Sequence, residues 1–267
     1  MNADYLKKIK RTLQRLVGDQ IYYRFGLLWL VTRPVYRTSA KRMQKYRDLY
    51  HGQRCFIIGN GPSLRNMDLS QLRSEVTFGL NRIYLLFDKI GFHTSFYVTV
   101  NKLVIQQCAD DILAKVSSPK FISYDARHWI KFVPDLMFLY CREGPQFYTD
   151  ITRGVWQGAT VTYIAMQLAY YMGFQQVILI GVDHTYQGNG KPNETVVSQG
   201  DDPNHFDPGY FGKGFRWQLP DLETSEIAYK MAKSQFERSG REIVDATVNG
   251  KLSVFRKVEY TTLFEND

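Results

Sequence analysis

Short apolar runs alternate with amphipathic stretches along most of the chain. The runs have the length of strands, and they lie at residues 54–58, 76–80, 95–100, 121–124, 137–140, 176–180 and 242–246. Helical spacing of apolar positions occurs between them, at residues 68–72, 102–116, 158–172 and 221–239. Such alternation is typical of a mostly parallel sheet with helices on both faces. The pattern therefore predicts one Rossmann-like α/β domain over residues 54–267.

The first 53 residues differ from this domain in pattern and in charge. Residues 5–17 place Leu6, Ile9 and Leu13 on one helical face, with lysine and arginine around the rest. Residues 1–54 hold 13 Lys/Arg against three Asp, a net charge of +10. Because the whole chain carries +8, the remaining residues carry −2. Residues 1–53 are therefore predicted to form a basic amphipathic helical arm.

Two interpretations of this arm are open. The mixture of aromatic and basic residues at 21–37 suits the headgroup region of an anionic membrane, which residues 1–50 would contact. Alternatively, the arm packs on its own domain or on a partner subunit in a homo-oligomer. Nucleic acid is not expected as a partner, because no known binding motif accompanies the charge.

Composition predicts a cytoplasmic protein, held peripherally at the inner face of the membrane if the first interpretation holds. The longest apolar run near the amino terminus, residues 25–31, is far shorter than the roughly 20 residues that span a bilayer. No small-residue cleavage site follows an apolar core, so a secretory signal is not expected. Cys55, Cys108 and Cys141 are odd in number and widely spaced, which favours free thiols in a reducing compartment.

The first apolar run leads into a turn of small residues that predicts a ligand-binding loop. Gly59 and Gly61 permit a positive φ and close approach of the backbone to a ligand. Pro62 presets the next turn. The amides of Gly61, Ser63 and Leu64, with the Ser63 hydroxyl, would then face an anion.

Three successive strands deliver a carboxamide at their carboxyl ends, which strengthens this interpretation. Asn60 follows the first strand, Asn81 the second and Asn101 the third. In an open parallel sheet, ligands bind at that edge. Three asparagines at one height predict a shared ligand rich in hydroxyl, carbonyl and amide groups.

Two segments of the carboxyl-terminal half complete the pattern. Gly158 to Met172 has almost no polar surface, so it predicts a buried helix that ends at Gly173. Residues 185–220 are rich in glycine and proline and show no periodicity, which predicts either a disordered insertion or an active-site lid. The aromatic residues within them, such as Tyr210 and Trp217, favour the lid.

These motifs resemble a known group of proteins. Ile57 to Leu64, Leu80-Asn81, Val100-Asn101 and Leu179 to Asp183 are similar to the donor-site framework of bacterial sialyltransferases that use CMP-sialic acid. They also resemble the 6-hydroxymethylpterin diphosphokinase-like (MptE-like) proteins, which occur among enzymes of surface-polysaccharide biosynthesis. The similarity covers about residues 54–245.

The resemblance implies a glycosyltransferase with a nucleotide-sugar donor and a glycan acceptor. Its donor site would contain Gly59, Asn60, Gly61, Pro62, Ser63, Asn81, Asn101, Thr160, Gly181 and Asp183. In the sialyltransferases an Arg-x-Thr-Ser-Gly segment contacts the donor; here Gly158 to Thr162 aligns with it and only Thr160 matches. Arg153 is the candidate to replace the missing arginine.

The resemblance also implies a catalytic group and no cofactor. The general base of the family is a lid histidine, which corresponds to His205, and His184 competes for this role. Tyr186 and Tyr210 are candidates for contacts to the phosphate. No metal is required, because the nucleotide leaves with its own stable negative charge.

Two other functions are open. A diphosphokinase would bind Mg²⁺ with ATP through Asp183, perhaps assisted by Asp201 and Asp202, although a solvated acidic turn is the plainer interpretation of that pair. A non-catalytic module that binds a sugar nucleotide is the third function. In a transferase, Asp183 would hold the nucleotide ribose or the adjoining loop.

Overall fold

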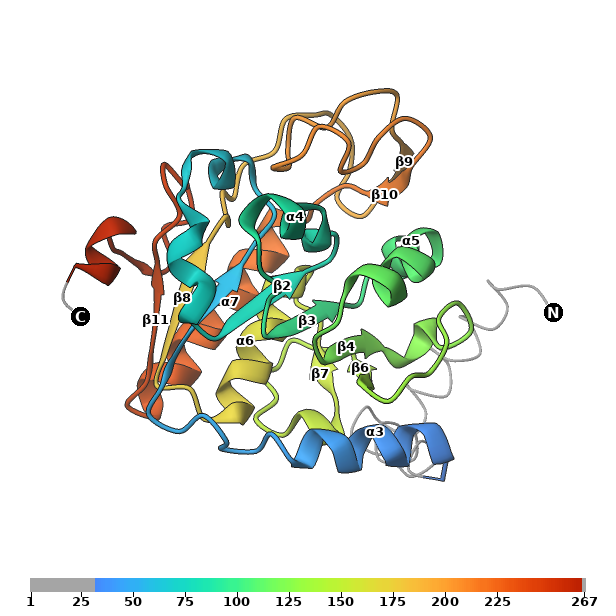
Figure 1. The fold of residues 1–267 in the computed structure, drawn as a ribbon, viewed down its shortest axis with the longest axis vertical. Coiled ribbons are helices and arrows are strands. Elements are labelled where there is room, and N and C mark those ends of the chain that lie inside the picture. Colours follow the sequence, from blue (N-terminus) through green and yellow to red (C-terminus); the bar gives the residue numbers. More distant parts are fainter. Residues whose placement is uncertain (1–31, 266–267) are drawn as a thin grey trace.

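The computed structural model describes residues 32–265. Their main feature is one eight-stranded sheet (Figure 1). Its strands are β1 (Arg54–Ile58), β2 (Thr77–Leu80), β3 (Phe96–Thr99), β4 (Lys120–Ser123), β5 (Leu136–Leu139), β8 (Gln176–Ile180), β11 (Glu242–Asp245) and β12 (Arg256–Lys257). They lie in the order β12-β11-β8-β1-β2-β3-β4-β5, and every pairing is parallel. The predicted α/β fold with a parallel sheet is confirmed.

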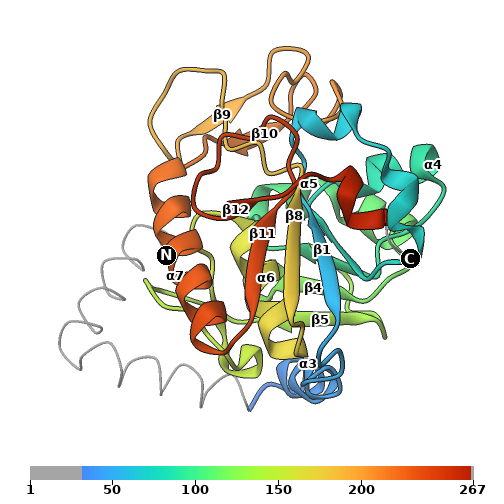
Figure 2. The same ribbon diagram turned by 90° about the vertical axis from the view of Figure 1, so that its left-hand side faces the viewer.

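Helices cover both faces of the sheet, so its central strands are apolar on both sides. In β1, Cys55 and Ile57 pack into one hydrophobic cluster, and Phe56 and Ile58 pack into the other. The first cluster is covered by α6 (Val161–Met172) and α7 (Leu222–Arg238). The second is covered by α4 (Phe87–Ile90), α5 (Lys102–Lys115) and the short 3₁₀ segments Pro62–Asn66, Leu69–Ser74 and Ile83–Leu86 (Figure 2).

The central helix α6 begins three residues later than its apolar pattern predicts. Gly158 and Ala159 have φ values of 55° and 57°, which do not continue into a helix. Thr160 is the N-cap, and its hydroxyl accepts a hydrogen bond from the Thr162 amide. The predicted stop is confirmed, because Gly173 is left-handed with a φ of 93°.

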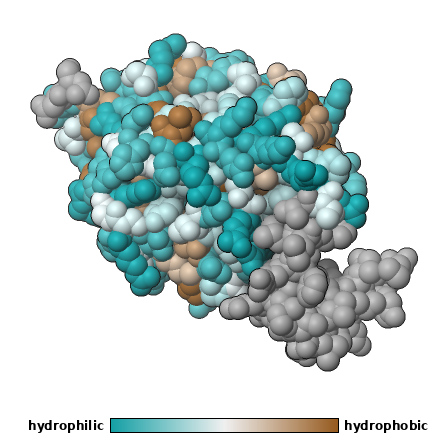
Figure 3. Space-filling model, turned by 90° about the horizontal axis from the view of Figure 1, so that it is seen from below, coloured by the Kyte–Doolittle hydropathy of each residue, from teal (hydrophilic) through white to brown (hydrophobic). Residues whose placement is uncertain are grey.

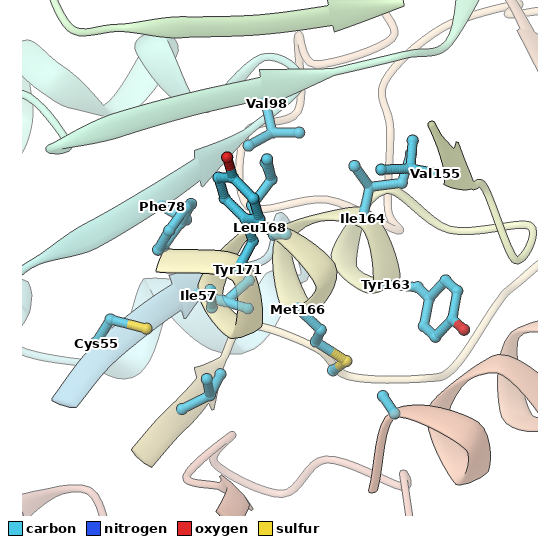
Figure 4. Close-up of a cluster of buried hydrophobic side chains, with 14 of the residues drawn as sticks. Cys55, Ile57, Phe78, Val98, Val155, Tyr163, Ile164, Met166, Leu168 and Tyr171 are labelled. Atoms are coloured by element: carbon cyan, nitrogen blue, oxygen red, sulfur yellow. The ribbon is translucent and has the colours of Figure 1, made fainter. Parts of the chain in front are cut away.

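Side chains of α6 fill the space beneath the middle of the sheet. Figure 4 shows Leu168 near Ile57, Phe78 and Val98 of three neighbouring strands, and Ile164 near Val155. These residues are 0% exposed, so the helix and the strands form one close-packed interior. The α6 amino end is thereby fixed against the sheet.

Part of the predicted arm belongs to the body of the domain. α3 (Pro34–Gln44) packs against β5 and buries Tyr36 and Met43. The Arg42 guanidinium donates to the carbonyl oxygens of Val133 and Leu136 at 2.9 Å. The helix predicted over residues 5–17 lies outside the described residues. Within residues 32–265, no helix has the length and apolar character needed to cross a bilayer.

The surface on the α3 side of the molecule is mainly hydrophilic, with small, separate hydrophobic spots (Figure 3). Figure 1 places α3 along this lower edge, at the opposite end of the molecule from the lid. The two ends therefore differ: the α3 end presents a polar outer surface, and the lid end holds the candidate site described below.

The chain adds its later strands on the opposite side of β1 from its earlier ones. From β1 it adds strands β2 to β5 on one side, and it then places β8, β11 and β12 on the other. The carboxyl ends of β1 and β8 therefore flank a topological switch point, where open parallel sheets bind ligands.

Residues 185–220 cover this edge (Figure 1). They contain the antiparallel pair β9 (Thr195–Val197) and β10 (Arg216–Gln218). They also bury Phe206, Tyr210 and Leu219, and we refer to residues 185–220 as the lid. Outside the main sheet, β6 (Cys141–Arg142) and β7 (Val155–Trp156) form a separate two-stranded parallel sheet. Three more 3₁₀ segments, Tyr124–Ala126, Ile151–Arg153 and Thr261–Phe264, complete the described elements.

Candidate active site

A cleft of about 1060 Å³ lies at the carboxyl ends of the strands, under the lid. This volume is at the upper end of the range typical of small-molecule sites. The cleft is lined by most of the residues that the sequence predicts for the site, namely Gly59, Asn60, Gly61, Asn81, Asn101, Thr160, Gly181, Asp183, His184, Tyr186 and His205. Pro62, Ser63, Tyr210 and Arg153 do not line it.

The loop after β1 does not offer its amides to a ligand. The Gly61 amide donates to the Gly181 carbonyl oxygen at 2.9 Å, and the Ser63 amide donates to Asp183 Oδ1 at 3.0 Å. The Leu64 amide donates to the Gly61 carbonyl oxygen at 3.3 Å. The prediction that these amides face an anion is therefore wrong in this arrangement.

The two glycines are needed for a different reason than the sequence suggests. Gly61 has a φ of −69°, and Gly59 is not left-handed either. A Cβ on Gly59 would overlap the Gly181 carbonyl group, and one on Gly61 would overlap the Asp183 carboxylate. The close approach is to the loop after β8, so this motif joins the two strands at the switch point.

The Asp183 side chain links the loop after β8 to the loop after β1. Its two oxygens accept from the Ser63 amide at 3.0 Å and from the Ser63 hydroxyl at 2.7 Å. Burial raises the pKa of the carboxyl group above its usual value, although the hydrogen bonds from Ser63 oppose the shift. The residue still lines the cleft, but its oxygens are engaged within the protein.

The three asparagines meet at the predicted edge, with different tasks. Asn101 Oδ1 caps α5 by accepting from the amides of Leu103 and Val104. Asn81, with a φ of 48°, accepts from the Thr99 hydroxyl at 2.9 Å. In both cases the acceptor oxygen is engaged, which leaves the amide nitrogen to donate to a ligand.

Asn60 differs from the other two. Its Oδ1 is buried without a hydrogen-bond partner in the described part of the chain. Its backbone carbonyl oxygen accepts from the Phe206 amide at 2.9 Å, which ties the β1 loop to the lid. Asn60 therefore supports the lid through its backbone.

The lid places a histidine and an aspartate together at the cleft. His205 Nδ1 lies 2.7 Å from Asp202 Oδ2, and the Asp202 side chain is 4% exposed. Because a carboxylate only accepts, we assign the shared hydrogen to Nδ1, which leaves the Nε2 lone pair available. The interpretation of Asp201 and Asp202 as a solvated turn is therefore wrong for Asp202, which is buried, whereas Asp201 is exposed.

Aromatic side chains fix the orientation of the His205 ring. It stacks on Tyr210 with ring centroids 3.9 Å apart and planes 3° apart, and the edge of Phe211 lies beside it. Tyr210 is fully buried, and its hydroxyl accepts from the Arg82 amide at 3.2 Å. Burial raises the pKa of Tyr210. In this arrangement Tyr210 supports the imidazole and does not reach the cleft.

The backbone at His205 is held from the β1 side. Arg65 donates to the carbonyl oxygens of His205 at 2.7 Å and of Phe206 at 2.8 Å. Arg82 donates to the Gly209 carbonyl oxygen at 3.2 Å, and its guanidinium lies over the rings of Tyr210 and Phe215. Two arginines near the ends of β1 and β2 thus anchor the lid.

Several cleft residues escaped prediction from sequence. Trp156 and Trp217 line the cleft, as do Arg142, Lys102 and Asp125. Trp217 lies beside Tyr186, with ring centroids 5.9 Å apart. Arg142 is the arginine that lines the cleft in place of the proposed Arg153, which is exposed outside it. Lone residues of this kind carry no sequence signal, because only the fold brings them to the cleft.

The fold and the site define an α/β protein with a lidded cleft at the switch point of a parallel sheet. A family model described as 6-hydroxymethylpterin diphosphokinase MptE-like matches residues 34–189. Because this match covers more than half of the chain, the chain belongs to the MptE-like family. No curated protein matches the chain.

Among solved structures, the chain is similar to the MAf glycosyltransferase from Magnetospirillum magneticum AMB-1. The TM-score is 0.50 and the sequence identity is 13%. The match covers 84% of this chain and 38% of that chain, so the protein spans less than half the length of that glycosyltransferase. At this identity the likeness concerns the fold alone.

Proposed function

We propose that the protein is a glycosyltransferase that moves an acidic sugar from a CMP-linked donor to a hydroxyl group of a surface-glycan acceptor. The observation that carries this proposal is the His205–Asp202 pair at the edge of the cleft. A histidine oriented by a buried carboxylate is the arrangement expected of a general base. The fold shared with a glycosyltransferase supports the same class.

The proposed reaction exchanges one carbon–oxygen bond for another and transfers one proton. The acceptor oxygen attacks the anomeric carbon of the donor sugar, and His205 Nε2 takes the proton of the acceptor hydroxyl. The bond from the anomeric carbon to the phosphate oxygen breaks, and its electron pair leaves with the nucleotide. Asp202 accepts from Nδ1, which stabilises the imidazolium that forms.

The side chains at the edge of the sheet would hold the donor. The amide nitrogens of Asn81 and Asn101 are donors toward hydroxyl or carbonyl oxygens, because their own oxygens are engaged elsewhere. Trp156 and Trp217 offer rings against which a base or a sugar can pack. Tyr186 lines the same wall, and it would contact the phosphate as the resemblance implies.

The family description favours a second candidate, an Mg²⁺-ATP-dependent diphosphokinase acting on a pterin. Such an enzyme needs carboxylates that converge on the metal. In this structure the Asp183 oxygens accept from Ser63, and the Asp202 oxygens accept from Asn204 and His205. This engagement favours the transferase, for which no metal is chemically required. A non-catalytic binding module would have no use for the His205–Asp202 pair.

Ligand titration separates these functions. We expect CMP or CDP to stabilise the protein in a thermal-shift or calorimetric titration, equally in Mg²⁺ and in EDTA. UDP, GDP and ATP are the comparison ligands. ATP binding that depends on Mg²⁺ would overturn the transferase in favour of the diphosphokinase.

Two substitutions then test the base. His205→Ala should leave CMP affinity nearly intact while turnover falls by about 10²-fold or more, the usual contribution of a general base. Asp202→Asn should lower turnover in the same way, because the Asn amide would donate to Nδ1 and place the ring hydrogen on Nε2. His128→Ala is the matched control, since His128 is exposed and does not line the cleft. Unchanged turnover in His205→Ala would remove this residue from the proposed role.

A further inference from the structure

A second imidazole faces the cleft and is held by a carboxylate of its own. His184 Nε2 lies 3.1 Å from Glu226 Oε1 on α7, and the His184 side chain is 9% exposed. Because the carboxylate only accepts, the hydrogen between them belongs to Nε2. Within residues 32–265, His184 Nδ1 has no hydrogen-bond partner, and the residue lines the cleft.

The backbone imposes this position on His184. Its φ is 54°, a left-handed value that few residues other than glycine adopt. Hydrogen bonds fix the preceding residue, Asp183. Its side chain accepts from Ser63, and its backbone carbonyl oxygen accepts from the Lys251 amide at 2.8 Å. Uncommon backbone conformations of this kind concentrate at functional sites.

The neighbours of His184 favour an anion. Tyr229 packs against His184 with ring centroids 6.2 Å apart, and its hydroxyl lies 3.3 Å from the Thr160 hydroxyl. Thr160 caps α6, whose first turn contains no acidic residue and lines the cleft. The amino end of a helix carries partial positive charge. His184 Nδ1 and the α6 amino end therefore flank one part of the cleft.

Among the described residues, carboxylates outnumber cations in the lining of the cleft. Asp125, Glu143, Asp183 and Asp221 line it against Lys102 and Arg142, so an anionic ligand needs further positive charge nearby. Lys102, which also lines it, already pairs with Asp125 at 3.0 Å. The amides of the β1 loop are engaged, as described above. His184 is a buried group that can supply a charged donor on the α6 side.

We propose that His184, held by Glu226, binds the phosphate of the nucleotide donor through Nδ1 and acts on the leaving group. This inference rests on the proposed function. It assigns the two histidines separate roles: His205 acts on the acceptor hydroxyl, and His184 acts on the donor phosphate.

The proposed role is consistent with the charge changes of the reaction. When the phosphate binds, the imidazole takes up a proton from solvent at Nδ1, because Glu226 and the phosphate then face its two nitrogens. As the bond from the anomeric carbon to the phosphate oxygen breaks, that oxygen receives the electron pair. The hydrogen bond from Nδ1 strengthens as this charge develops, which lowers the barrier. The acceptor proton goes to His205 and does not involve His184.

Binding measurements isolate the phosphate contact. We expect His184→Gln to weaken CMP binding by about 10-fold or more, the usual effect of losing a charge-assisted hydrogen bond, and to leave cytidine binding unchanged. Glu226→Gln should weaken CMP binding in the same direction and by a smaller factor. His205→Gln is the matched control and should leave both affinities unchanged. Melting temperatures of all variants report whether each one folds.

Kinetics then separate the donor role from a role on the acceptor. In His184→Gln, transfer to the acceptor and hydrolysis of the donor without acceptor should fall by the same factor. In His205→Gln, transfer should fall by a larger factor than hydrolysis. If His184→Gln leaves the ratio of CMP to cytidine affinity unchanged, the inference is overturned. If the unmodified protein does not bind CMP at all, the proposed function itself fails, which is a distinguishable result.

Discussion

Asp183 and Asp221 both line the cleft, yet the protein shifts their pKa values in opposite directions. Burial is the largest influence on Asp183, and it raises the pKa of this carboxyl group. Asp221 caps α7, and the hydrogen bond from the Thr224 amide is the largest influence, which lowers its pKa. The two carboxylates therefore contribute to stability with opposite dependence on pH.

Replacing Asp183 should change how stability depends on pH. Because the folded state raises this pKa, it binds more protons than the unfolded state between the two pKa values, and stability falls as pH rises through that window. Asp183→Asn keeps a partner for Ser63 and removes the titration. Relative to the unmodified protein, the variant should therefore gain stability as pH rises above the usual carboxyl pKa, by about 1.4 kcal/mol for each unit of the shift.

Denaturant unfolding at a series of pH values measures this change. Asp221→Asn is the matched control with the opposite sign, since a lowered pKa stabilises the folded state only when the carboxyl group is ionised. Its stability relative to the unmodified protein should fall as pH rises. Parallel curves for Asp183→Asn and the unmodified protein would contradict the assignment of Asp183 as a carboxylate with a raised pKa.

At the scale of elements, the pattern of apolar residues predicts those strands and helices that are long enough to show a periodicity. β1, β8 and α7 fall where the pattern predicts them. β6, β7 and β12 have only two residues each, so no periodicity could indicate them. Their positions depend on pairing with another strand, β6 with β7 and β12 with β11, which two residues alone do not encode.

The β1 loop shows why a motif can be located from sequence and its contacts cannot. Its small residues correctly marked a close approach at the end of β1. The object approached is the loop after β8, about 120 residues later in the chain, and not a ligand. Similarly, the sequence alone predicts an exposed Asp202, because the burial of its side chain and its contact with His205 arise only in the folded lid.

Gly59→Ala should therefore destabilise the protein for a purely steric reason. The added Cβ would meet the Gly181 carbonyl group, which is backbone and has little freedom to move. We expect a loss of about 1–3 kcal/mol in the free energy of unfolding, typical of overpacking, as measured by the denaturant midpoint. Gly200→Ala is the control, because a Cβ there meets nothing within 4 Å. Equal stability of the two variants would show that the loops can separate without cost.

At the scale of the whole molecule, the charge is distributed unevenly along the chain. Residues 1–54 carry +10 and the rest of the chain −2. The described part of this basic region includes α3, whose inner face packs on β5. Arg37 and Lys41 of α3 are exposed, as is its C-cap residue Lys45, and α3 lies at the end of the molecule opposite the lid. Basic residues on this side therefore lie away from the cleft.

We therefore propose that the protein binds anionic lipid through its basic residues before position 54. At about 1 kcal/mol per basic residue near an anionic surface, a few such contacts would hold the protein on a membrane at physiological salt. Deleting residues 1–50 would remove α3, which buries Tyr36 and Met43, so the experiment needs variants that spare the core. Deletion of residues 1–31 removes six Lys/Arg, and R37Q/K41Q/K45Q neutralises three exposed positions, two in α3 and one at its C-cap. Co-sedimentation with vesicles that contain anionic lipid should fall in each variant and fall further when they are combined, with vesicles of neutral lipid as the control. Binding that is equal on neutral and anionic vesicles, or unaffected by the combined variant, would show that this charge has another partner.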